Sequence, residues 1–445
     1  MGETSSSQTV STKLERIAKL AKQAPGMVLT TLAHHIDEQW LQEAFRRTRK
    51  SGARGVDGQG ADEYATNLEE NLRALLSRAK SGEYRAPPVR RVHIPKGDGQ
   101  TRPLGIPTFE DKVLQRAVAM VLEAVYEQDF LDCSFGFRPG RSAHDALGRL
   151  RDTLMEMGGG WVVEVDIRKY FDTINHEQLR DVLRQRIGDG VLLRLIGKWL
   201  NAGVMEAGEL SHPDAGTPQG GVISPLLANI YLHEVLDLWF ERDVRRRLDG
   251  RAKLVRYADD FVIVFEHEAD ARRVMEVLPK RFGKFGLALH PDKTRLVEFR
   301  RPSNRGKFDG ETGDGSPPGT FDLLGFTHVW GKSKNGYWVV QVKTAKSRFR
   351  RGLKRIADWC KKSRHQPVAE QWRGLVAKVR GHFAYFGVIG NKHALFAFRT
   401  EVYAAWRRAL DRRSQRARVT WAKMKRLHQR YPLPHLPVLR PLHGA

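Results

Sequence analysis

Cysteine is nearly absent from this sequence of 445 residues, which contains only Cys133 and Cys360. Two cysteines exclude a disulfide framework, and they exclude a cysteine-rich zinc module as well. A protein without such crosslinks suits a reducing compartment, which predicts a cytoplasmic location. Stability must then come from packed cores, and the chain is long enough for two or three domains.

Long hydrophobic runs are also missing, because no stretch of about eighteen apolar residues is present that could span a membrane as a helix. The start of the sequence, MGETSSSQTVSTK, is polar and lacks the apolar segment of a secretion signal. We therefore expect a soluble protein with no membrane partner, and we expect residues 1–13 to form a disordered tail. No internal repeat of fixed period occurs.

Acidic residues are scarce in the last quarter of the chain. Residues 341–445 contain 26 Lys and Arg against 4 Asp and Glu, while residues 1–340 are close to neutral. Such a cationic block is suited to neutralising phosphates, and its binding should weaken steeply with salt. A solvated basic face or a disordered tail would carry the same charge, but the Trp, Tyr and Phe interleaved through the block favour a folded module. Acidic lipid is a poorer match, because the apolar residues are spaced as helix-packing faces rather than as an anchor.

Apolar spacing and turn residues predict the secondary structure. The expected helices cover residues 14–50, 62–81, 110–128, 175–187 and 269–285, with a further helix opening at residue 224, and the expected strands cover 87–95, 101–107, 161–166 and the pair 253–265. The alternation of strands and helices over residues 85–340 predicts an α+β sheet domain with helices on one face. The basic remainder is expected to be mostly helical to about residue 430.

The run 253–265, KLVRYADDFVIVF, predicts two strands joined by a turn that carries Asp259 and Asp260. Adjacent carboxylates repel each other, and an ordinary hairpin turn more often takes Asn-Gly or Asp-Gly, so a bound cation is the expected reason for the pair. Asp166 ends another apolar strand. If these strands are neighbours in one sheet, three carboxylates converge on an all-oxygen site of the kind that Mg²⁺ prefers. Two such ions would give the geometry of phosphoryl transfer.

Seven motifs then occur in the order typical of one family: RPLGIP (102–107), SFGFRPGRSAHDAL (134–147), VDIRKYFDTINH (165–176), GTPQGGVISPLLANIYL (216–232), RYADDF (256–261), GLALHPDKT (286–294) and LLGF (323–326). With these motifs, residues 53–430 resemble the reverse transcriptases encoded within bacterial group II introns. The resemblance implies an α+β right-hand polymerase fold. Its expected parts are the tail (1–13), an N-terminal extension with fingers (14–155), a palm (156–342), a helical thumb or maturase X domain (343–430) and a basic, proline-containing tail (431–445).

The resemblance also implies roles for residues at the catalytic centre. Asp166, Asp259 and the carbonyl of Ile167 would hold two Mg²⁺ ions, for which Mn²⁺ can substitute, and Asp260 would assist as a further acid. Lys293 would protonate the leaving pyrophosphate. A lone lysine is more often a solvated surface group, so this last role has a plain structural alternative.

The incoming dNTP has its own expected contacts. Lys96 and Arg102 would hold the triphosphate, since a lysine point charge and an arginine fork both suit phosphate oxygens. Gln219 would support the sugar end of the nucleotide. Phe171 would lie under the sugar, where its ring would collide with a 2′-hydroxyl and so select deoxynucleotides; the alternative for this ring is ordinary core packing.

Nucleic-acid contacts are expected from a Gly/Pro loop near residue 138 and from the segment 371–387, which resembles the maturase region. The residues are Arg138, Arg141, Trp372, Arg373, Lys378, Arg380 and His382. Recognition of structured RNA by such a region depends on shape, backbone charge and 2′-hydroxyls. Solvated surface arginines are the alternative for the loop.

The leading interpretation is an RNA-directed DNA polymerase, a nucleotidyltransferase, that assists splicing of its group II intron RNA and copies it into DNA during retrohoming. Its expected partners are the intron RNA, an RNA template with a DNA primer, target DNA and dNTPs, and its expected location is the bacterial cytoplasm near the nucleoid. The oligomeric state stays open. The family often adds a zinc-containing endonuclease, which we expect to be lacking here, so that DNA entry would use reverse splicing and an existing primer.

Two alternative functions remain at this point. One is a domesticated reverse transcriptase in a defence or CRISPR-associated system, and the other is an RNA-binding maturase without polymerase activity. The intact Asp166, Asp259 and Asp260 argue against the second, because a pure binder has no need for repelling acids. An RNA-dependent RNA polymerase is disfavoured by Phe171.

Overall fold

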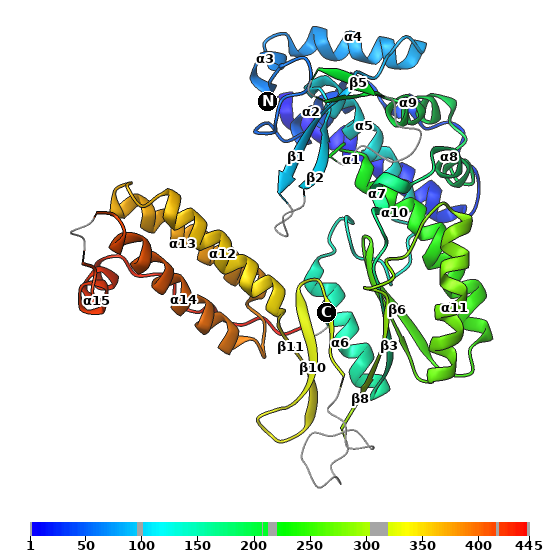
Figure 1. Ribbon diagram of the computed structural model, residues 1–445. Helices are drawn as coiled ribbons and strands as arrows, with labels where there is room; N and C mark the ends of the chain where they lie inside the picture. The colour runs from blue at the N-terminus through cyan, green and yellow to red at the C-terminus, as the bar shows by residue number, and fades with distance from the viewer. Residues whose placement is uncertain are drawn as a thin grey trace. The chain divides into compact units, whose positions relative to one another are not determined.

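The structure is a computed structural model that describes residues 2–95, 101–206, 208–211, 220–302, 319–414 and 418–442. The chain divides into two compact units, each made of three segments. The first unit comprises Met1–Ser142, Val165–Phe261 and Arg272–Thr294, and the second comprises Ala143–Glu164, Val262–Ala271 and Arg295–Ala445. Figure 1 labels the elements. Their mixture of helices and sheets confirms the expected α+β class, while the expected domain limits stay predictions.

The first unit begins with helices and then adds strands. In chain order, its elements are α1 (Gly2–Gln23), α2 (Glu38–Arg47), α3 (Ala61–Ala65), α4 (Leu68–Ser81), β1 (Val89–Pro95), β2 (Thr101–Ile106), α5 (Phe109–Tyr126), α7 (Tyr170–Thr173), α8 (His176–Arg184), α9 (Gly190–Leu200), β4 (Val204–Glu206), β5 (Glu209–Ser211), α10 (Ser224–Leu232) and β6 (Ala252–Tyr257). After α10 the helix continues in π-helical form over His233–Leu238 and Phe240–Val244. Strand β7 (Asp260–Phe265) and helix α11 (Glu268–Lys284) have residues in both units.

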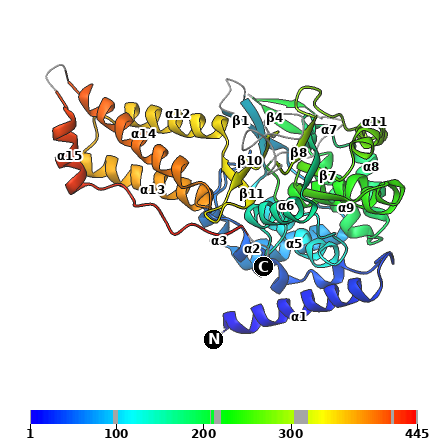
Figure 2. The ribbon, with the colours of Figure 1, turned by 90° about the horizontal axis from the view of Figure 1, so that it is seen from below.

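Helix α1 corrects the expectation of a disordered start, because it begins at Gly2 (Figure 2). Val10, Ile17 and Ala21 are buried at helical spacing, and the helix packs on α2 and α5. Its last turn is held by the buried Arg186, whose guanidinium donates to the carbonyls of Ala21 and Ala24. The order of this segment therefore comes from tertiary packing, which its polar composition does not reveal.

A buried polar cluster fixes the start of α5. The carboxylate of Asp111 accepts hydrogen bonds from the Tyr84 hydroxyl, from Trp199 Nε1 at 2.7 Å and from Gln115 Nε2 at 3.0 Å. Asp111 is only 2% exposed. Burial raises the pKa of this carboxyl to about 6, although the three hydrogen bonds oppose the rise.

Asp111 predicts a pH-dependent stability. Its folded-state pKa of about 6 exceeds the ordinary aspartate pKa of 3.8, so between these limits the folded chain binds the proton more tightly than the unfolded chain. The contribution of this group is fully present below about pH 4, and the free energy of unfolding should fall by on the order of 3 kcal/mol as the pH rises through about 6. Urea unfolding of Asp111→Asn should lack this slope. Parallel pH profiles of the wild type and the variant would contradict the assignment.

Strands β2, β1, β4 and β5 form a sheet in that order. Strands β1 and β2 are antiparallel from Arg90↔Ile106 to Pro95↔Thr101, and β1 pairs in parallel with β4 at Val89↔Val204. The two strands of the hairpin were expected at 87–95 and 101–107. Strands β4 and β5 were not expected, because each has only three residues and shows too little of a period to be recognised.

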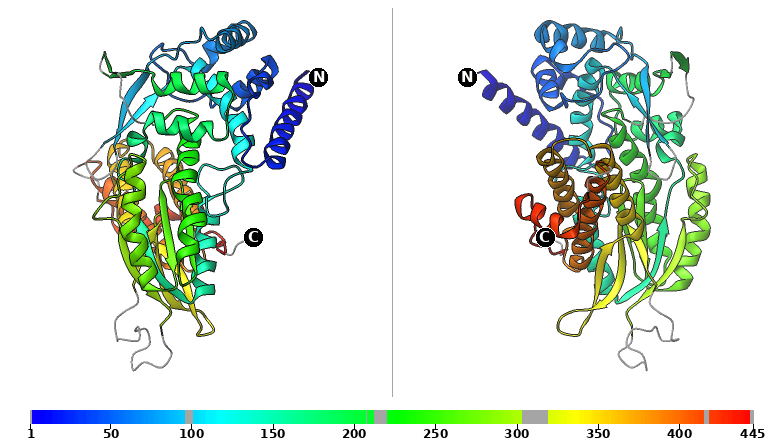
Figure 3. Two further views of the ribbon diagram at one scale, coloured as in Figure 1. Left: turned by 90° about the vertical axis from the view of Figure 1, so that its right-hand side faces the viewer. Right: turned by 60° about the vertical axis from the view of Figure 1, so that its left-hand side comes forward.

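The second unit contains α6 (Ala143–Met157), β3 (Gly159–Val165), β8 (Arg295–Arg300), β9 (Phe321–Leu323), β10 (Phe326–Lys332) and β11 (Trp338–Thr344). One sheet has the order β6-β7-β3-β8, and another has the order β11-β10-β9. Strands β3 and β8 are antiparallel from Gly159↔Arg300 to Glu164↔Arg295. Strands β10 and β11 form a long hairpin, drawn in yellow in Figure 3.

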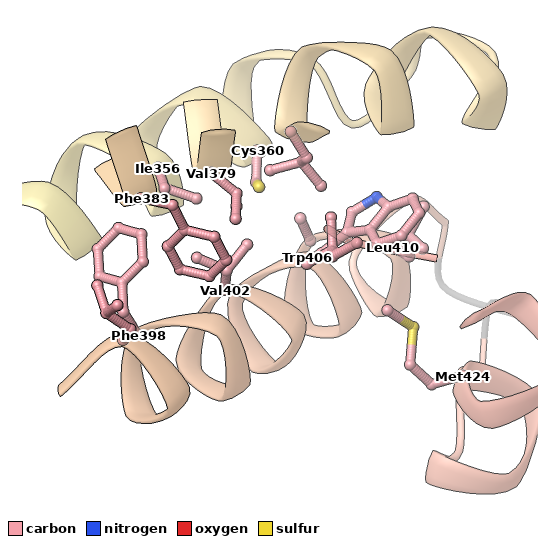
Figure 4. Close-up of a cluster of buried hydrophobic side chains, with 13 residues drawn as sticks. Ile356, Cys360, Val379, Phe383, Phe398, Val402, Trp406, Leu410 and Met424 are labelled. Carbon is pink, nitrogen blue, oxygen red and sulfur yellow. The ribbon is translucent and has the colours of Figure 1, made fainter. Parts of the chain in front are cut away.

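Four helices complete the second unit: α12 (Lys346–Lys362), α13 (Val368–Phe386), α14 (Lys392–Asp411) and α15 (Trp421–Arg430). Helices α12, α13 and α14 lie side by side in Figure 1. Their core is apolar, and Figure 4 shows Ile356 and Cys360 of α12 facing Phe398, Val402 and Trp406 of α14. The helical expectation for this basic region is confirmed. Among the described helices, none combines the length and apolarity needed to cross a membrane.

Candidate active site

The turn between β6 and β7 consists of Ala258 and Asp259, whereas the sequence predicts a turn that also carries Asp260, which here opens β7. Ala258 has a φ of 56°, in the left-handed region that a residue with a Cβ adopts at a cost. Asp259 is half-buried and Asp260, the first residue of β7, is exposed. A strained backbone at a turn with a partly buried acid is typical of a functional site.

A fully buried arginine lies beneath this turn. Arg256 of β6 is 0% exposed, and its fork binds Asp237 through Nε at 2.7 Å and Nη2 at 2.5 Å. Its Nη1 donates to Asn229 Oδ1 at 2.9 Å and to the Ala258 carbonyl at 3.1 Å, and Nη2 also donates to Ser134 Oγ at 2.8 Å. All five N–H groups of the guanidinium are therefore satisfied. We call Arg256, Asp237, Asn229 and Ser134 the arginine cluster.

The charges inside the arginine cluster compensate each other. Burial alone would raise the pKa of the Asp237 carboxyl, but the charge and hydrogen bonds of Arg256 lower it overall. Asp237 therefore stays ionised, and a charged pair lies 0% exposed in the core. The pair holds the Ala258 carbonyl and thereby supports the strained turn.

The loop that follows Ser134 packs directly on the same turn. The Phe135 N–H donates to the Arg256 carbonyl at 2.9 Å, and the Arg256 N–H donates to the Cys133 carbonyl at 2.8 Å. A Cβ added at Gly136 would overlap the backbone nitrogen of Ala258, so only glycine permits this approach. The SFGFRPGRS motif and the RYADDF motif thus form one structural feature.

Asp166 follows directly after β3 and is pinned by the segment 287–294. The His290 N–H donates to the Asp166 carbonyl and the Arg168 N–H donates to the Ala288 carbonyl, both at 2.8 Å. These bonds flank an antiparallel bridge between Ile167 and Leu289. Neither bond uses the Ile167 carbonyl, the group expected to be a metal ligand.

Strands β3 and β7 are neighbours in one sheet, and the start of β3 at Gly160 lies against the end of β7 at Phe265, so Asp166 after β3 and Asp259 before β7 lie at the same end of the sheet. Burial raises the pKa of the Asp259 carboxyl, and the negative charge of Asp166 raises it further, while Arg102 and Arg256 lower it. The ionised form of Asp259 is thus disfavoured without added positive charge. The donors are all oxygen, which suits a hard divalent cation.

Asp260 is the third carboxylate of the expected ligand set, and its role as an assisting acid stays a prediction. Within the described residues, no group of three or more His, Cys, Asp and Glu side chains lies in metal-binding geometry. Successive residues of extended backbone point to opposite sides, so Asp260 at the start of β7 need not join Asp259. The charge of Asp166 acts on Asp259, while Asp260 is exposed at the start of β7.

Phe171 occupies a short helix that begins five residues beyond the strand end. Lys169, with a φ of 48°, turns the chain into α7. Tyr170 is buried, and its hydroxyl donates to the Ala228 carbonyl at 2.6 Å, which anchors α7 on α10. The Phe171 ring meets the Tyr170 ring edge-on, with centroids 5.4 Å apart, and stays half-buried. This leaves part of the ring available to a ligand.

Of the residues expected to contact the nucleotide's triphosphate and sugar end, only Arg102 is among the described residues. Arg102 is exposed on β2, and its positive charge lowers the pKa of Asp259. Lys96 and Gln219 lie outside the described residues. The chain just after Gln219 is anchored, because the Val222 N–H donates to Gln115 Oε1 at 2.8 Å.

Lys293 lies beside the carboxylate pair. Its Nζ is 3.0 Å from Asp166 Oδ2, and its side chain is 56% exposed. The ammonium group therefore supplies positive charge next to Asp166. Its expected role as a proton donor to pyrophosphate stays a prediction.

The two loop arginines differ in their surroundings. Arg138 is buried, forks onto Glu127 and donates to the carbonyls of Leu131 and Ser134. With its donors used inside the protein, Arg138 has a supporting role in the structure rather than the expected phosphate contact. Arg141 binds Asp132 at 2.7 Å near the surface.

The residues expected to contact nucleic acid in the thumb also differ in their surroundings, and two of them pack inside the protein. The His382 ring stacks on Phe398 with centroids 3.5 Å apart, and burial lowers the pKa of His382 to about 4, so it is neutral near pH 7. Trp372 donates from Nε1 to the Pro432 carbonyl at 2.8 Å and packs against the thumb core. Both residues therefore pack helices together, which corrects the expectation of nucleic-acid contact for His382.

Arg373, Lys378 and Arg380 are exposed on α13 and fit the expected basic surface. Lys378 also lies 4.8 Å from the centroid of the Trp359 ring. Over the described residues from 346 to 442, no Lys or Arg lies within 4.0 Å of an acidic side chain. The described cations of this region therefore form no salt bridge with acidic side chains.

The arginine cluster and Gln115 were not found from the sequence. The signal for Arg256 was an arginine between apolar residues in a run that otherwise reads as a buried strand, and Asp237 interrupts an apolar helix in the same way. Two opposite charges at core positions indicate a buried ion pair. Only the structure identifies them as partners.

The sequence is similar to proteins of one known family. The family described as reverse transcriptase (RNA-dependent DNA polymerase) matches residues 94–328, more than half of the chain. Protein YkfC of Escherichia coli (strain K12) is 36% identical over 329 residues, which cover 64% of this chain and 84% of YkfC.

Two further relatives carry names that refer to introns. The group II intron-encoded protein LtrA of Lactococcus lactis subsp. cremoris is 38% identical over 247 residues, covering 53% of this chain and 40% of LtrA. Nuclear intron maturase 2, mitochondrial, of Arabidopsis thaliana is 28% identical over 231 residues, covering 43% of this chain and 30% of that protein. The alignments thus span less than half of both relatives. From the paired carboxylates and the match over residues 94–328, the chain belongs to the reverse transcriptase family of RNA-dependent DNA polymerases.

Proposed function

We propose that this protein copies group II intron RNA into DNA and also binds that RNA to assist its splicing. The observation that carries the polymerase part is the placement of Asp166 and Asp259 at the ends of the neighbouring strands β3 and β7, within the segment that matches the reverse transcriptase family. The family generally uses divalent metal ions. The names of LtrA and of the Arabidopsis maturase support the intron part.

Mg²⁺ is the cation that this site would hold, with Mn²⁺ as a substitute. Asp166, Asp259 and the Ile167 carbonyl would be its ligands, because they form an all-oxygen set whose paired negative charges favour a cation. When bound, the ion supplies positive charge that polarises the attacking hydroxyl and offsets charge on the leaving oxygen.

The surrounding residues would orient the substrates. Arg102 is exposed near Asp259, where its fork can bind the triphosphate of a dNTP together with Lys96. Lys293 would keep Asp166 oriented through its 3.0 Å contact and place a proton donor near the leaving group. Gln219 would contact the sugar end of the nucleotide.

RNA would be held by the basic helices of the second unit. Their apolar faces are used in the thumb core, while Arg373, Lys378 and Arg380 stay exposed. Cations without acidic partners release counterions when they bind phosphates, which makes affinity fall with salt. Sequencing the RNA that copurifies with the full chain tests this partner: enrichment of one structured intron supports the intron role, and an unselective mixture contradicts it.

Phe171 predicts the sugar selectivity of the polymerase. Phe171→Ala should remove the ring that excludes a 2′-hydroxyl, so the kcat/KM ratio for dTTP over UTP should fall by about 10- to 100-fold on poly(rA)/oligo(dT). Steady-state single-nucleotide extension measures the ratio. Tyr337→Ala, at a ring 72% exposed on the β10–β11 hairpin, is the control. An unchanged ratio in the Phe171 variant would leave the ring with a packing role only.

A further inference from the structure

Phe137 is an exposed aromatic residue held in a strained conformation beside the catalytic turn. Its side chain is 50% exposed, and its φ is 57°, in the left-handed region. The described residues include only four non-glycine residues with positive φ, and Lys169 and Ala258 of the active site are two of the others. A bulky residue seldom adopts this conformation without a functional reason.

The residues on either side of Phe137 are anchored in the protein. Gly136 is pressed against Ala258, and its carbonyl accepts a hydrogen bond from Asn229 Nδ2 of the arginine cluster. Arg138 is 6% exposed and is fixed by the carboxylate of Glu127. The exposure of the Phe137 ring is therefore a property of a well-anchored loop rather than of a free one.

The position of the ring identifies what it can bind. Gly136 packs against Ala258 of the turn that carries Asp259, so Phe137 begins one residue from that turn, close to the proposed path of the nucleic-acid strands. Aromatic rings stack on bases of any sequence. A base inside a duplex is already stacked on both faces, so an unpaired template base is the partner that gains a contact.

We infer that Phe137 is a stacking platform for an unpaired base of the template strand as it enters the active site. This inference rests on the proposed polymerase function and adds a residue that positions the template. The strain at Phe137 has a clear purpose in this arrangement, because a left-handed residue between two anchored neighbours directs the ring outward.

The test compares two template–primers that differ only at the template end. One has a 5′ template overhang of several unpaired nucleotides and the other ends flush with the primer, and both are bound to the full-length protein without dNTP. Phe137→Asn removes the ring while accepting the left-handed backbone, so folding is preserved. The affinity gained from the overhang should fall on the order of tenfold in this variant.

Two further variants make the result specific. Phe137→Tyr keeps an aromatic ring and should retain the gain, and Tyr337→Asn removes an exposed ring elsewhere and should leave it unchanged. The inference is overturned if Phe137→Asn keeps the full gain, or if it weakens binding of both substrates equally. Failure of the wild type to extend a primer would instead overturn the proposed function, so the two failures are distinguishable.

Discussion

Asp259→Ala is expected to abolish dNTP incorporation on a poly(rA)/oligo(dT) template, with a loss of at least about a thousandfold in kcat. The variant lacks one of the two carboxylates that would hold the cation, and the charge stabilisation supplied at such sites accounts for several kcal/mol of the barrier. Single-turnover primer extension at saturating primer and Mg²⁺ measures the loss. RNA binding should persist, because the basic helices of the second unit are untouched.

Asp260→Ala provides the matched control for this experiment. Asp260 adjoins Asp259 in sequence and has the same charge, but it is exposed at the start of β7. Asp260→Ala should therefore lower kcat less than Asp259→Ala does. Primer extension by the Asp259 variant at the wild-type rate would show that the chemistry lies elsewhere.

Arg256→Met is expected to produce the largest loss of stability. The variant leaves the Asp237 carboxylate in the core without its partner, and breaking a buried ion pair in this way costs about 3–5 kcal/mol. Urea unfolding should give a correspondingly lower free energy of unfolding. Arg273→Met is the surface control, since Arg273 and Asp249 form an exposed ion pair at 2.8 Å whose loss should cost no more than about 1 kcal/mol.

A double variant separates folding from positioning. Arg256→Met combined with Asp237→Leu removes both charges and keeps an apolar volume, which often restores stability. The Ala258 carbonyl would still lack its hydrogen bond, so we expect kcat to stay low while template–primer affinity recovers. Recovery of kcat together with stability would show that the arginine cluster only holds the fold.

The sequence predicts this site wherever the signal is local. The pair of strands around Ala258 and Asp259 is recognised because two β-branched runs flank a polar turn, and α5 is recognised because its apolar residues recur at helical spacing. The family motifs add expected roles for individual residues. Of these expectations, the structure supports the placement of Asp166 and Asp259 at the ends of neighbouring strands.

Features that depend on distant partners are not predictable in this way. Arg256 binds Ser134, which is 122 residues away in the chain, and neither residue alone signals a buried contact. Residues 2–13 of α1 were not expected to be helical for the same reason, since packing of this helix on α5 decides its order. His382 was interpreted from the charge of its neighbours, but its position on the inner side of α13 decides its role.

The apolar core of the α12–α14 helices has a consequence for how this protein can change. Residues such as Ile356, Phe398 and Trp406 hold these helices together, while no described cation there depends on an acidic partner. Mutation of exposed residues such as Arg373 and Arg380 should alter RNA affinity with little effect on folding. Affinity for a new RNA can therefore evolve, or be engineered, one surface residue at a time, on a scaffold that tolerates each step.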